Sequence, residues 1–220
     1  MPDRLDIVAT KDGSSTIYSS RFDAHYHSIH GAVQESEYVF IKQGLEYWRQ
    51  SQHHREISVL EYGMGTGLNV ALTHQYVKRH DLNVRYHTLE AYPISDDISQ
   101  LISYKGLSSL EAIHQASWDQ VAVIGDHLML HKHQVEFEQY TSDQRFDVIY
   151  YDAFGPGAQP HLWERPMVEK VVSMIAGNGV LVTYCAQGAF RRILIDMGLL
   201  VERLQGPPGK RHMVRAQKKS

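Results

Sequence analysis

Gly63, Gly65 and Gly67 stand at every second position of VLEYGMGTGLNVAL, between an apolar run and a stretch with apolar residues at helical spacing. Glycine allows positive φ angles and lets a ligand approach without a clash against a Cβ atom. The start of a following helix adds free backbone N–H groups. The pattern therefore predicts a turn between a strand and a helix that holds a nucleotide-like ligand.

Two acidic residues follow other apolar runs that are typical of strands. Glu90 ends VRYHTLEAY, where its carboxylate is placed to accept hydrogen bonds from both hydroxyls of a ribose. Asp152 ends FDVIYYD, just before a loop rich in glycine and proline. Beside the bound ligand, Asp152 would lie where a transferred group must pass; the alternative is that it only caps the next turn.

The spacing of the glycines separates two classes of ligand. Dinucleotide-binding proteins carry G-x-G-x-x-G, whereas this loop has G-x-G-x-G with Glu61 just before it. The shorter spacing resembles motif I of the S-adenosylmethionine (SAM) methyltransferases. It favours SAM as the cofactor, and a nicotinamide-dependent oxidoreductase is the alternative.

Alternating strands and helices must position these groups. Asp12-Gly13 predicts a hairpin, and residues 32–48 predict an amphipathic helix. Strands are expected at 57–62, 84–89, 128–132, 146–151, 179–184 and 199–205, and residues 213–216 are expected to pair antiparallel with the last of these. Such alternation predicts a doubly wound α/β fold with a mostly parallel sheet, which binds ligands at the carboxyl ends of its strands.

Composition limits the size and setting of this fold. With 220 residues, 43% of them hydrophobic, the chain suits one core. We expect an N-terminal hairpin and helix extension over residues 1–50 and the main domain over 51–220. No apolar run reaches the roughly 18 residues of a membrane span, and the start lacks a signal core, so we expect a cytoplasmic protein without a membrane partner. The single cysteine, Cys185, excludes an internal disulfide and indicates a packed thiol.

Charge is distributed unevenly along the chain. The formal charge of the whole protein is -3, but residues 186–220 hold eight basic residues and two acids. That segment is therefore +6 and the remainder -9. Its basic members are Arg191, Arg192, Arg203, Lys210, Arg211, Arg215, Lys218 and Lys219. The asymmetry indicates a surface for a polyanion, or else a basic tail that only solvates the protein.

Five segments together resemble one methyltransferase family: YSSRFDAHYHSIHGAVQESEYVFI, LEYGMGTGLNVALT, YYDAFGPGAQPHLW, TYCAQGAFRRILIDMGLLVE and GPPGKRHMVRA. They are similar to the SAM-dependent enzymes that complete 5-methylaminomethyl-2-thiouridine at the wobble position of tRNA. The resemblance runs from about Asp12 to Ala216 and corresponds to the methyltransferase half of the bifunctional modification enzyme or to its free-standing form, which we expect here because no flavin domain is seen. It implies a Rossmann-like class I methyltransferase fold with an antiparallel last strand, SAM as cofactor, and the anticodon stem-loop of tRNA as partner.

The resemblance also implies roles for individual residues. Gly63, Gly65 and Gly67 match the SAM loop, with Glu61 before it, Asn69 at the helix start and Glu90 as the ribose acid. Asp152 matches the active-site aspartate of the motif D-A-F-x-P. The segment GAVQES, which contains Glu35, matches an element near cofactor or substrate. Glu136 replaces the adenine-facing aspartate of relatives, although Glu138 could serve instead.

Methyl transfer from a sulfonium requires neither a metal nor a covalent nucleophile. The methyl group is already activated, so alignment of an amine and exclusion of water dominate. An alkyl amine has a pKa near 10.4, so forming its free base at pH 7 costs about 4.6 kcal/mol. We expect Asp152 to orient the amine and stabilise the positive charge on nitrogen, with proton uptake secondary.

Remaining candidates concern the RNA. Tyr26 and His27 are expected to line a uridine pocket, and a base could stack on Tyr26, Phe154 or Trp163. GPPGKR matches a loop that borders the substrate opening. Phosphates are expected to contact the pairs Lys210-Arg211 and Arg191-Arg192.

The sequence also bears on metal binding and on two alternative functions. His25, His27 and His30 lie close together in sequence, and His131 and His133 share one face of a strand, but neither group has a matching further ligand, so no metal site is expected. A methyltransferase for small amines or proteins, and a noncatalytic RNA-binding module, are the competing functions.

Overall fold

The computed structural model describes residues 3–52 and 54–219. Its first element is a small antiparallel sheet of β1 (Leu5–Ala9), β2 (Ser15–Ser19) and β3 (Ala24–His25). The turn between β1 and β2 contains Gly13 at φ +81°. The hairpin expected at Asp12-Gly13 is therefore confirmed. A domain boundary at residue 50 stays a prediction.

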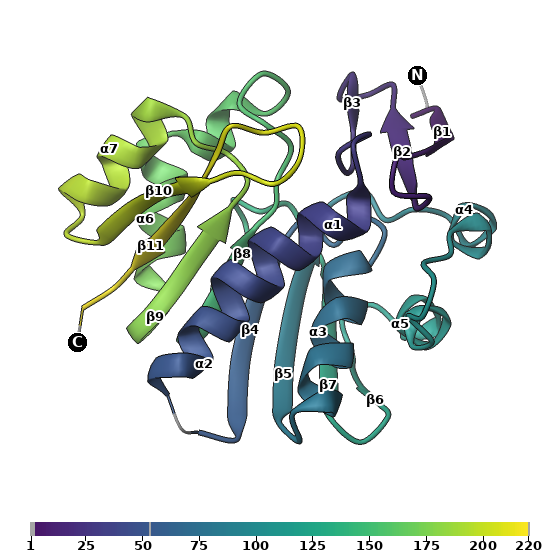
Figure 1. Cartoon of the computed structure of the whole chain (residues 1–220), viewed down its shortest axis with the longest axis horizontal. Helices are drawn as coiled ribbons and strands as arrows, with labels where there is room; N and C mark the ends of the chain where they lie inside the picture. Colours follow the sequence, from purple (N-terminus) through teal and green to yellow (C-terminus); the bar gives the residue numbers. More distant parts are fainter. Residues whose placement is uncertain (1–2, 53, 220) are drawn as a thin grey trace.

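An eight-stranded sheet forms the centre of the protein, in the order β10-β11-β9-β8-β4-β5-β7-β6 (Figure 1). Its strands are β4 (Glu56–Tyr62), β5 (Asn83–Glu90), β6 (Val121–Ile124), β7 (Leu128–Gln134), β8 (Phe146–Tyr151), β9 (Ile175–Thr183), β10 (Leu200–Gln205) and β11 (His212–Gln217). The five strands from β7 to β9 are parallel, and β11 lies antiparallel between β9 and β10. The predicted doubly wound, mostly parallel sheet with an antiparallel last strand is confirmed. The antiparallel strand β6 was not expected, because its four residues carry too short a pattern.

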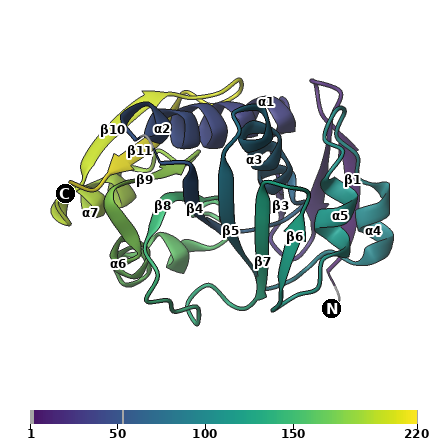
Figure 2. The ribbon, with the colours of Figure 1, turned by 90° about the horizontal axis from the view of Figure 1, so that it is seen from below.

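Helices cover both faces of this sheet. The first face is covered by α1 (Ala32–Ser36), η1 (Glu37–Glu46), α2 (Tyr47–Ser51) and α3 (Leu68–Arg79), and the second by α6 (Arg165–Ser173) and α7 (Gly188–Asp196) (Figure 2). The helix expected over residues 32–48 exists and extends to Ser51, but its middle part, η1, is π-helical. Shorter helices α4 (Asp96–Leu101), α5 (Leu110–Gln115) and η2 (Pro160–Trp163) complete the connections.

The order in which strands are added to the sheet reverses between β4 and β8, which are themselves parallel. After β4 the chain adds β5 next to it, then β6 at the edge of the sheet and β7 between β6 and β5. It then returns to place β8 and β9 on the other side of β4. In open α/β sheets ligands bind in the crevice that such a reversal leaves at the carboxyl ends of the strands. Among the described residues, no helix is both long and apolar enough to span a membrane.

Candidate active site

The carboxyl ends of β4, β5 and β8 are tied together by backbone hydrogen bonds. Gly63 N and Met64 N donate to Leu89 O at 3.0 and 3.1 Å, and Asp152 N donates to Tyr62 O at 3.0 Å. The glycine loop after β4, Glu90 at the end of β5 and Asp152 after β8 therefore meet at one edge of the sheet. This is the crevice expected from the strand order.

A cavity of about 340 Å³ opens at this edge. Most of the predicted site residues line it: Tyr26, His27, Glu35, Gly63, Gly65, Glu90, Glu136, Glu138, Asp152, Phe154 and Lys210. Six other predicted site residues do not line it: Glu61, Gly67, Asn69, Arg191, Arg192 and Arg211. The first group therefore lies together in one pocket, and the second lies behind the pocket or on the outer surface.

The glycine loop is shaped by two close approaches. Gly63 has φ +95°, and a Cβ atom there would lie 2.8 Å from the backbone oxygen of Asp152. Gly65 has φ +52°, and its Cβ would lie 2.8 Å from Cδ1 of Tyr26. Because Asp152 O belongs to the backbone of the site, the space at Gly63 cannot be enlarged by a side-chain rotation.

Replacing Gly63 by alanine is expected to lower the free energy of unfolding by about 1–3 kcal/mol, because positive φ and the contact with Asp152 O both oppose a Cβ atom. Urea denaturation measures the change. Gly157→Ala is the matched control, since no atom lies within 4 Å of its Cβ position. Equal stabilities for the two variants would show that the loop tolerates a side chain.

Glu90 is bound to the glycine loop by its carboxylate. Its oxygens accept hydrogen bonds from Gly65 N and Tyr92 N, each at 3.0 Å, and burial raises its pKa. A carboxylate has about four acceptor positions, so acceptor capacity remains for the hydroxyls of a ribose. Tyr92 also donates through its hydroxyl to Glu136 at 2.8 Å, whereas Glu138 pairs with His161 at 2.9 Å. Glu136 thus belongs to the Glu90 end of the pocket.

Glu61 and Asn69 form a buried layer beneath the pocket. Glu61 is fully buried and accepts hydrogen bonds from Thr88 Oγ1 at 2.7 Å and from Asn69 Nδ2 at 2.9 Å. The same Asn69 amide donates to Asp152 Oδ2 at 2.9 Å. Burial raises the pKa of Glu61 to about 8, so Glu61 is mostly protonated at pH 7. The sequence predicted that both residues contact the cofactor directly. Their position beneath the pocket instead favours a role in holding Asp152 and the glycine loop in place.

Asp152 is a stronger proton acceptor than an aspartate in water. Burial raises its pKa well above the usual value, and the neighbouring Glu61 and Glu35 raise it further, against the opposing effects of Lys210 and Asn69. Its side chain is still partly accessible from the cavity. Proton uptake by Asp152 is therefore a larger part of its expected role than the sequence alone predicted.

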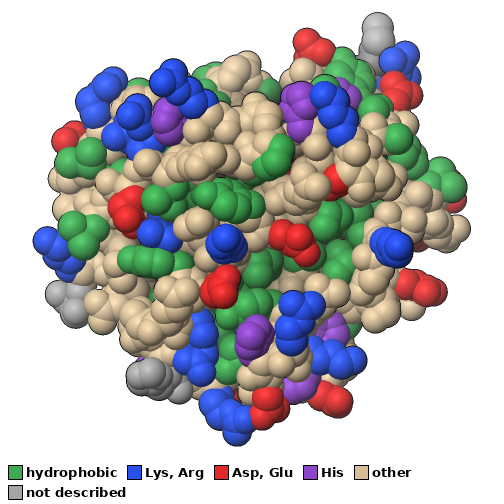
Figure 3. All heavy atoms as spheres, in the orientation of Figure 1, with side chains coloured by type: hydrophobic (Ala, Val, Ile, Leu, Met, Phe, Trp, Pro, Cys, Tyr) green, Lys and Arg blue, Asp and Glu red, His purple; other side chains and the backbone are tan. Residues whose placement is uncertain are grey.

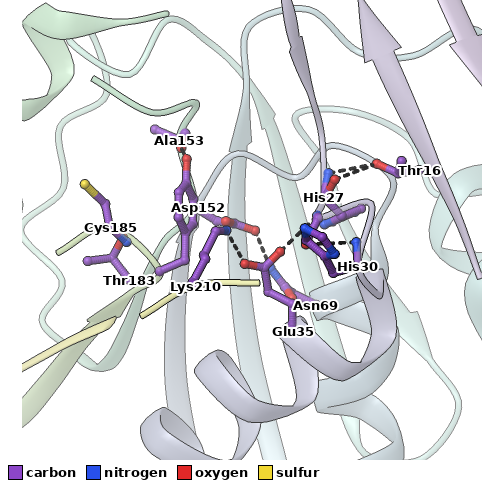
Figure 4. Close-up of polar contacts among 12 residues, drawn as sticks. Thr16, His27, His30, Glu35, Asn69, Asp152, Ala153, Thr183, Cys185 and Lys210 are labelled. Carbon is purple, nitrogen blue, oxygen red and sulfur yellow. Dashed lines mark hydrogen bonds and ion pairs between the residues drawn. The ribbon is translucent and has the colours of Figure 1, made fainter. Parts of the chain in front are cut away.

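Lys210 and Glu35 form an ion pair at the other wall of the pocket, near Asp152 (Figure 4). Glu35 is 6% exposed and also accepts a hydrogen bond from Ser28 N at 2.9 Å. The Lys210 ammonium lies 3.7 Å from the centroid of the Tyr184 ring. The structure thus separates the predicted phosphate pair: Lys210 faces the pocket, and phosphate binding by its ammonium would first have to break the ion pair.

Aromatic side chains line part of the cavity. Phe154 stacks on Phe22 with ring centroids 4.4 Å apart and meets Tyr26 edge-on at 5.2 Å. Trp163 is only 2% exposed and donates from Nε1 to Phe154 O at 2.8 Å, so its ring is not accessible for base stacking. Phe22, which sequence reasoning missed, stands in the same segment as Tyr26 but shows no distinguishing pattern.

His27 lies in the cavity as a neutral imidazole. Burial lowers its pKa to about 4, and Nε2 shares a hydrogen bond with Thr66 Oγ1 at 2.7 Å. Cys185 is buried, and burial raises the pKa of its thiol, which agrees with a packed residue. For the predicted pair His131 and His133, the structure supplies a third imidazole, His87, that the sequence did not point to.

The basic side chains of residues 186–220 lie partly on the surface and partly in the interior. Desolvation and the nearby Arg203, Arg211 and Arg191 lower the pKa of His212, which identifies a basic cluster at this end of the sheet. Lys and Arg side chains gather over α7 and β10 at the upper left of Figure 3. Arg215, in contrast, is 7% exposed and pairs with Glu202 at 2.8 Å. We refer to Arg191, Arg203 and Arg211 as the basic cluster.

Known proteins resemble this chain in sequence. Residues 107–219 match the family described as S-adenosyl-L-methionine-dependent methyltransferase. The tRNA 5-methylaminomethyl-2-thiouridine biosynthesis bifunctional protein MnmC of Pseudoalteromonas atlantica is 28% identical, with 95% of this chain and 33% of that protein aligned. For MnmC of Paraburkholderia phymatum the identity is 30%, over 94% of this chain and 34% of that protein. The chain thus spans about one third of the length of these curated relatives.

Solved structures share the fold. MNMC2 from Aquifex aeolicus has a TM-score of 0.86 and 21% identity, covering 100% of this chain and 71% of that one. Spermidine synthase from Thermotoga maritima has a TM-score of 0.63 and 15% identity, covering 99% and 70%. At these identities the likeness establishes the architecture.

Proposed function

Because this chain belongs to the S-adenosyl-L-methionine-dependent methyltransferases, we propose that its acceptor is the primary amine of 5-aminomethyl-(2-thio)uridine at the wobble position of tRNA. The product is 5-methylaminomethyl-(2-thio)uridine. The observation that carries this proposal is a single pocket that joins the glycine loop and Glu90 to two further acids, Asp152 and Glu35. The curated relatives carry the same nucleoside in their names. A tRNA substrate implies a cytoplasmic enzyme.

The residues at the Glu90 end fit the cofactor. Glu90 offers a carboxylate to the ribose hydroxyls, and Phe137 and Ala91 line the cavity as apolar neighbours for an adenine. Gly63 and Gly65 have no side chain to block a close approach of the cofactor. Glu136, close to Glu90 through Tyr92, is our choice for the acid near the adenine. When bound, SAM supplies a methyl group activated by the positive charge on sulfur.

The charge of the pocket favours cationic reactants. Among the described lining residues there are five carboxyl groups, those of Glu35, Glu90, Glu136, Glu138 and Asp152, and one ammonium, that of Lys210. A sulfonium and a protonated amine both carry positive charge, and a cleft lined by one sign of charge concentrates the opposite one. An anionic or neutral acceptor would gain nothing from this arrangement.

Asp152 is the residue that prepares the amine. Its raised pKa allows its carboxylate to take a proton from the incoming ammonium at a smaller cost than an aspartate in water would require. The amide of Asn69 holds the Oδ2 atom, so Oδ1 is available to the substrate. Asp152 then passes this proton to solvent through the open cavity and regains its negative charge. That charge stabilises the nitrogen as it forms its bond to carbon and becomes positive.

The aromatic lining of the cavity and the basic cluster fit a tRNA anticodon stem-loop. Sequence-specific recognition of RNA commonly places an unstacked base on aromatic rings. Phe154, Phe22 and Tyr26 provide such rings in the lining of the cavity. Arg203 and Arg211 are exposed, and neither forms an ion pair with an acid among residues 3–52 and 54–219, so both can meet phosphates.

Replacing Arg203 and Arg211 together by alanine is expected to weaken tRNA binding and reduce the slope of log affinity against log salt by about 1.5, since each phosphate contact contributes roughly 0.7–0.9. Affinity for SAM should not change, because neither residue lines the cavity. The matched control is the pair Arg55 and Arg85, which form ion pairs with Asp81 and Glu56. A slope that falls equally in both double variants would place the RNA surface elsewhere.

The class of acceptor is tested by comparing substrates at equal concentration with labelled SAM. We expect methyl transfer to tRNA lacking the final methyl, and kcat/KM at least about 100-fold lower for the free aminomethyl nucleoside or a small primary amine, since these lack the phosphate contacts. Equal transfer to small amines, or binding of tRNA without any transfer, would overturn the proposal.

A further inference from the structure

One part of the central sheet presents histidines on a face without a helix. On the second face, α6 and α7 lie beneath the β8 and β9 side, and Figure 2 shows no helix among the described residues beneath β5, β7 and β6. His131 and His133 alternate to the same face of β7, and His87 is the register partner of His131 on β5. Three imidazoles from two parallel strands therefore share this surface.

The three side chains are close enough to share one ion. A ring nitrogen of each lies within 4.8 Å of the others, and all three residues are half-buried. His87 Nδ1 and His133 Nε2 are 3.0 Å apart, within hydrogen-bond distance. Two nitrogens bound to one tetrahedral zinc are about 3.4 Å apart, given Zn–N distances of roughly 2.0–2.1 Å. Small rotations of the side chains therefore suffice to bring three nitrogens onto a single ion.

The surroundings hold these imidazoles in place. The rings of His133 and Tyr140 lie 5.0 Å apart, and those of His87 and Phe146 lie 5.4 Å apart. Asp119, which lines the same depression, adds a negative charge at its edge. None of the three histidines lines the cavity that contains Asp152. The cluster is therefore distinct from the active site.

We propose that His87, His131 and His133 bind one divalent transition-metal ion, with Zn²⁺ as its representative, and leave the fourth position open to solvent. Three imidazoles and a water form the ligand set of a known class of zinc site. Imidazole nitrogens suit zinc, copper and nickel, whereas magnesium and calcium prefer oxygen. The ion would join β5 to β7 just before Glu90 and the segment that carries Glu136.

The protonation state agrees with this chemistry. Burial lowers the pKa of His87 and of His133 to about 4, with His131 as a further cause for both. Both imidazoles are therefore neutral at pH 7, which is the form that binds metal.

The proposal is tested on the untagged 220-residue chain after treatment with a chelator. Zn²⁺ is titrated in competition with a chromophoric chelator, and Co²⁺ is added separately to obtain a ligand-field spectrum. We expect one high-affinity Zn²⁺ per chain and a Co²⁺ spectrum of low coordination number. His87→Ala, His131→Ala and His133→Ala should each weaken Zn²⁺ binding more than about tenfold, because even changes to outer partners of a metal site cost 10- to 100-fold.

The matched control is His80→Ala, which removes a histidine at the end of α3 that lies against Tyr76. It should leave Zn²⁺ affinity unchanged. Histidine NMR signals of the unmodified protein provide a measurement independent of the folding of any variant, and Zn²⁺ should shift three imidazoles only. Absence of stoichiometric Zn²⁺ binding, or shifts spread over other histidines, would show that the three rings merely pack against one another.

Discussion

Asp152→Asn is expected to lower the rate of methyl transfer by about 10²–10³, the scale for losing one preorganised electrostatic partner. Asparagine is nearly the same size as aspartate and can still accept the hydrogen bond from Asn69. It carries no charge to take up the proton of the amine or to offset the positive charge on the methylated nitrogen. A higher pH supplies more free amine but not the missing charge, so rescue at high pH should be partial.

The same substitution should not cost stability. The pKa of Asp152 is higher in the folded protein than in the unfolded chain. Its contribution to the free energy of unfolding is therefore fully present below the pKa of the unfolded chain, and is lost as the pH rises through the pKa of the folded protein. Neutral asparagine has no such loss. We therefore expect the variant to be at least as stable as the wild type at pH 8 and similar to it at pH 4, as measured by thermal unfolding.

Single-turnover rates with tRNA and SAM both saturating separate chemistry from binding. Asp147→Asn is the matched control on the same strand, because Asp147 accepts hydrogen bonds from Ser58 N and Oγ at the opposite end of β8. That change should affect stability and leave the rate close to wild type. A rate within about threefold of wild type for the Asp152 variant would make Asp152 a structural residue.

Glu90→Ala is expected to weaken SAM binding by about 1.5–3 kcal/mol, the range for hydrogen bonds to a charged group, which corresponds to roughly 10- to 150-fold. The carboxylate would be lost both to the ribose hydroxyls and to Gly65 N, which it holds in the glycine loop. Glu90→Gln keeps one acceptor oxygen and should give an intermediate affinity.

Calorimetry with SAM measures these affinities directly. Glu111→Ala is a suitable control, since Glu111 lies on α5 and does not line the cavity. Unchanged SAM affinity in a folded Glu90→Ala protein would remove Glu90 from the cofactor site.

Local patterns were sufficient to predict the elements that carry the site. The glycine spacing, the acid after each strand and the alternation of strands and helices place Gly63, Glu90 and Asp152 at one sheet edge, because parallel strands align their carboxyl ends. The resemblance to a family added Glu35, which belongs to a helix far from the others in sequence. These residues do line one cavity in the structure.

Contacts between distant segments could not be predicted in the same way. His87 meets His131 only through the register of β5 and β7, and Asn69 bridges Glu61 and Asp152 through side-chain orientation alone. Lys210 stands beside Arg211 in sequence, yet the turn before β11 directs its ammonium toward Glu35. Spacing along the chain contains no information on these orientations, since they depend on packing across the fold.

The most direct measurement identifies the wobble nucleoside after reaction. tRNA that lacks the final methyl is incubated with the protein and SAM carrying a deuterated methyl group, then digested and examined by mass spectrometry. The proposed function predicts that 5-aminomethyl-(2-thio)uridine disappears, that its labelled 5-methylaminomethyl product replaces it in equal amount, and that other nucleosides stay unlabelled. Label in any other nucleoside, or an unchanged wobble position while SAM is consumed, would contradict it.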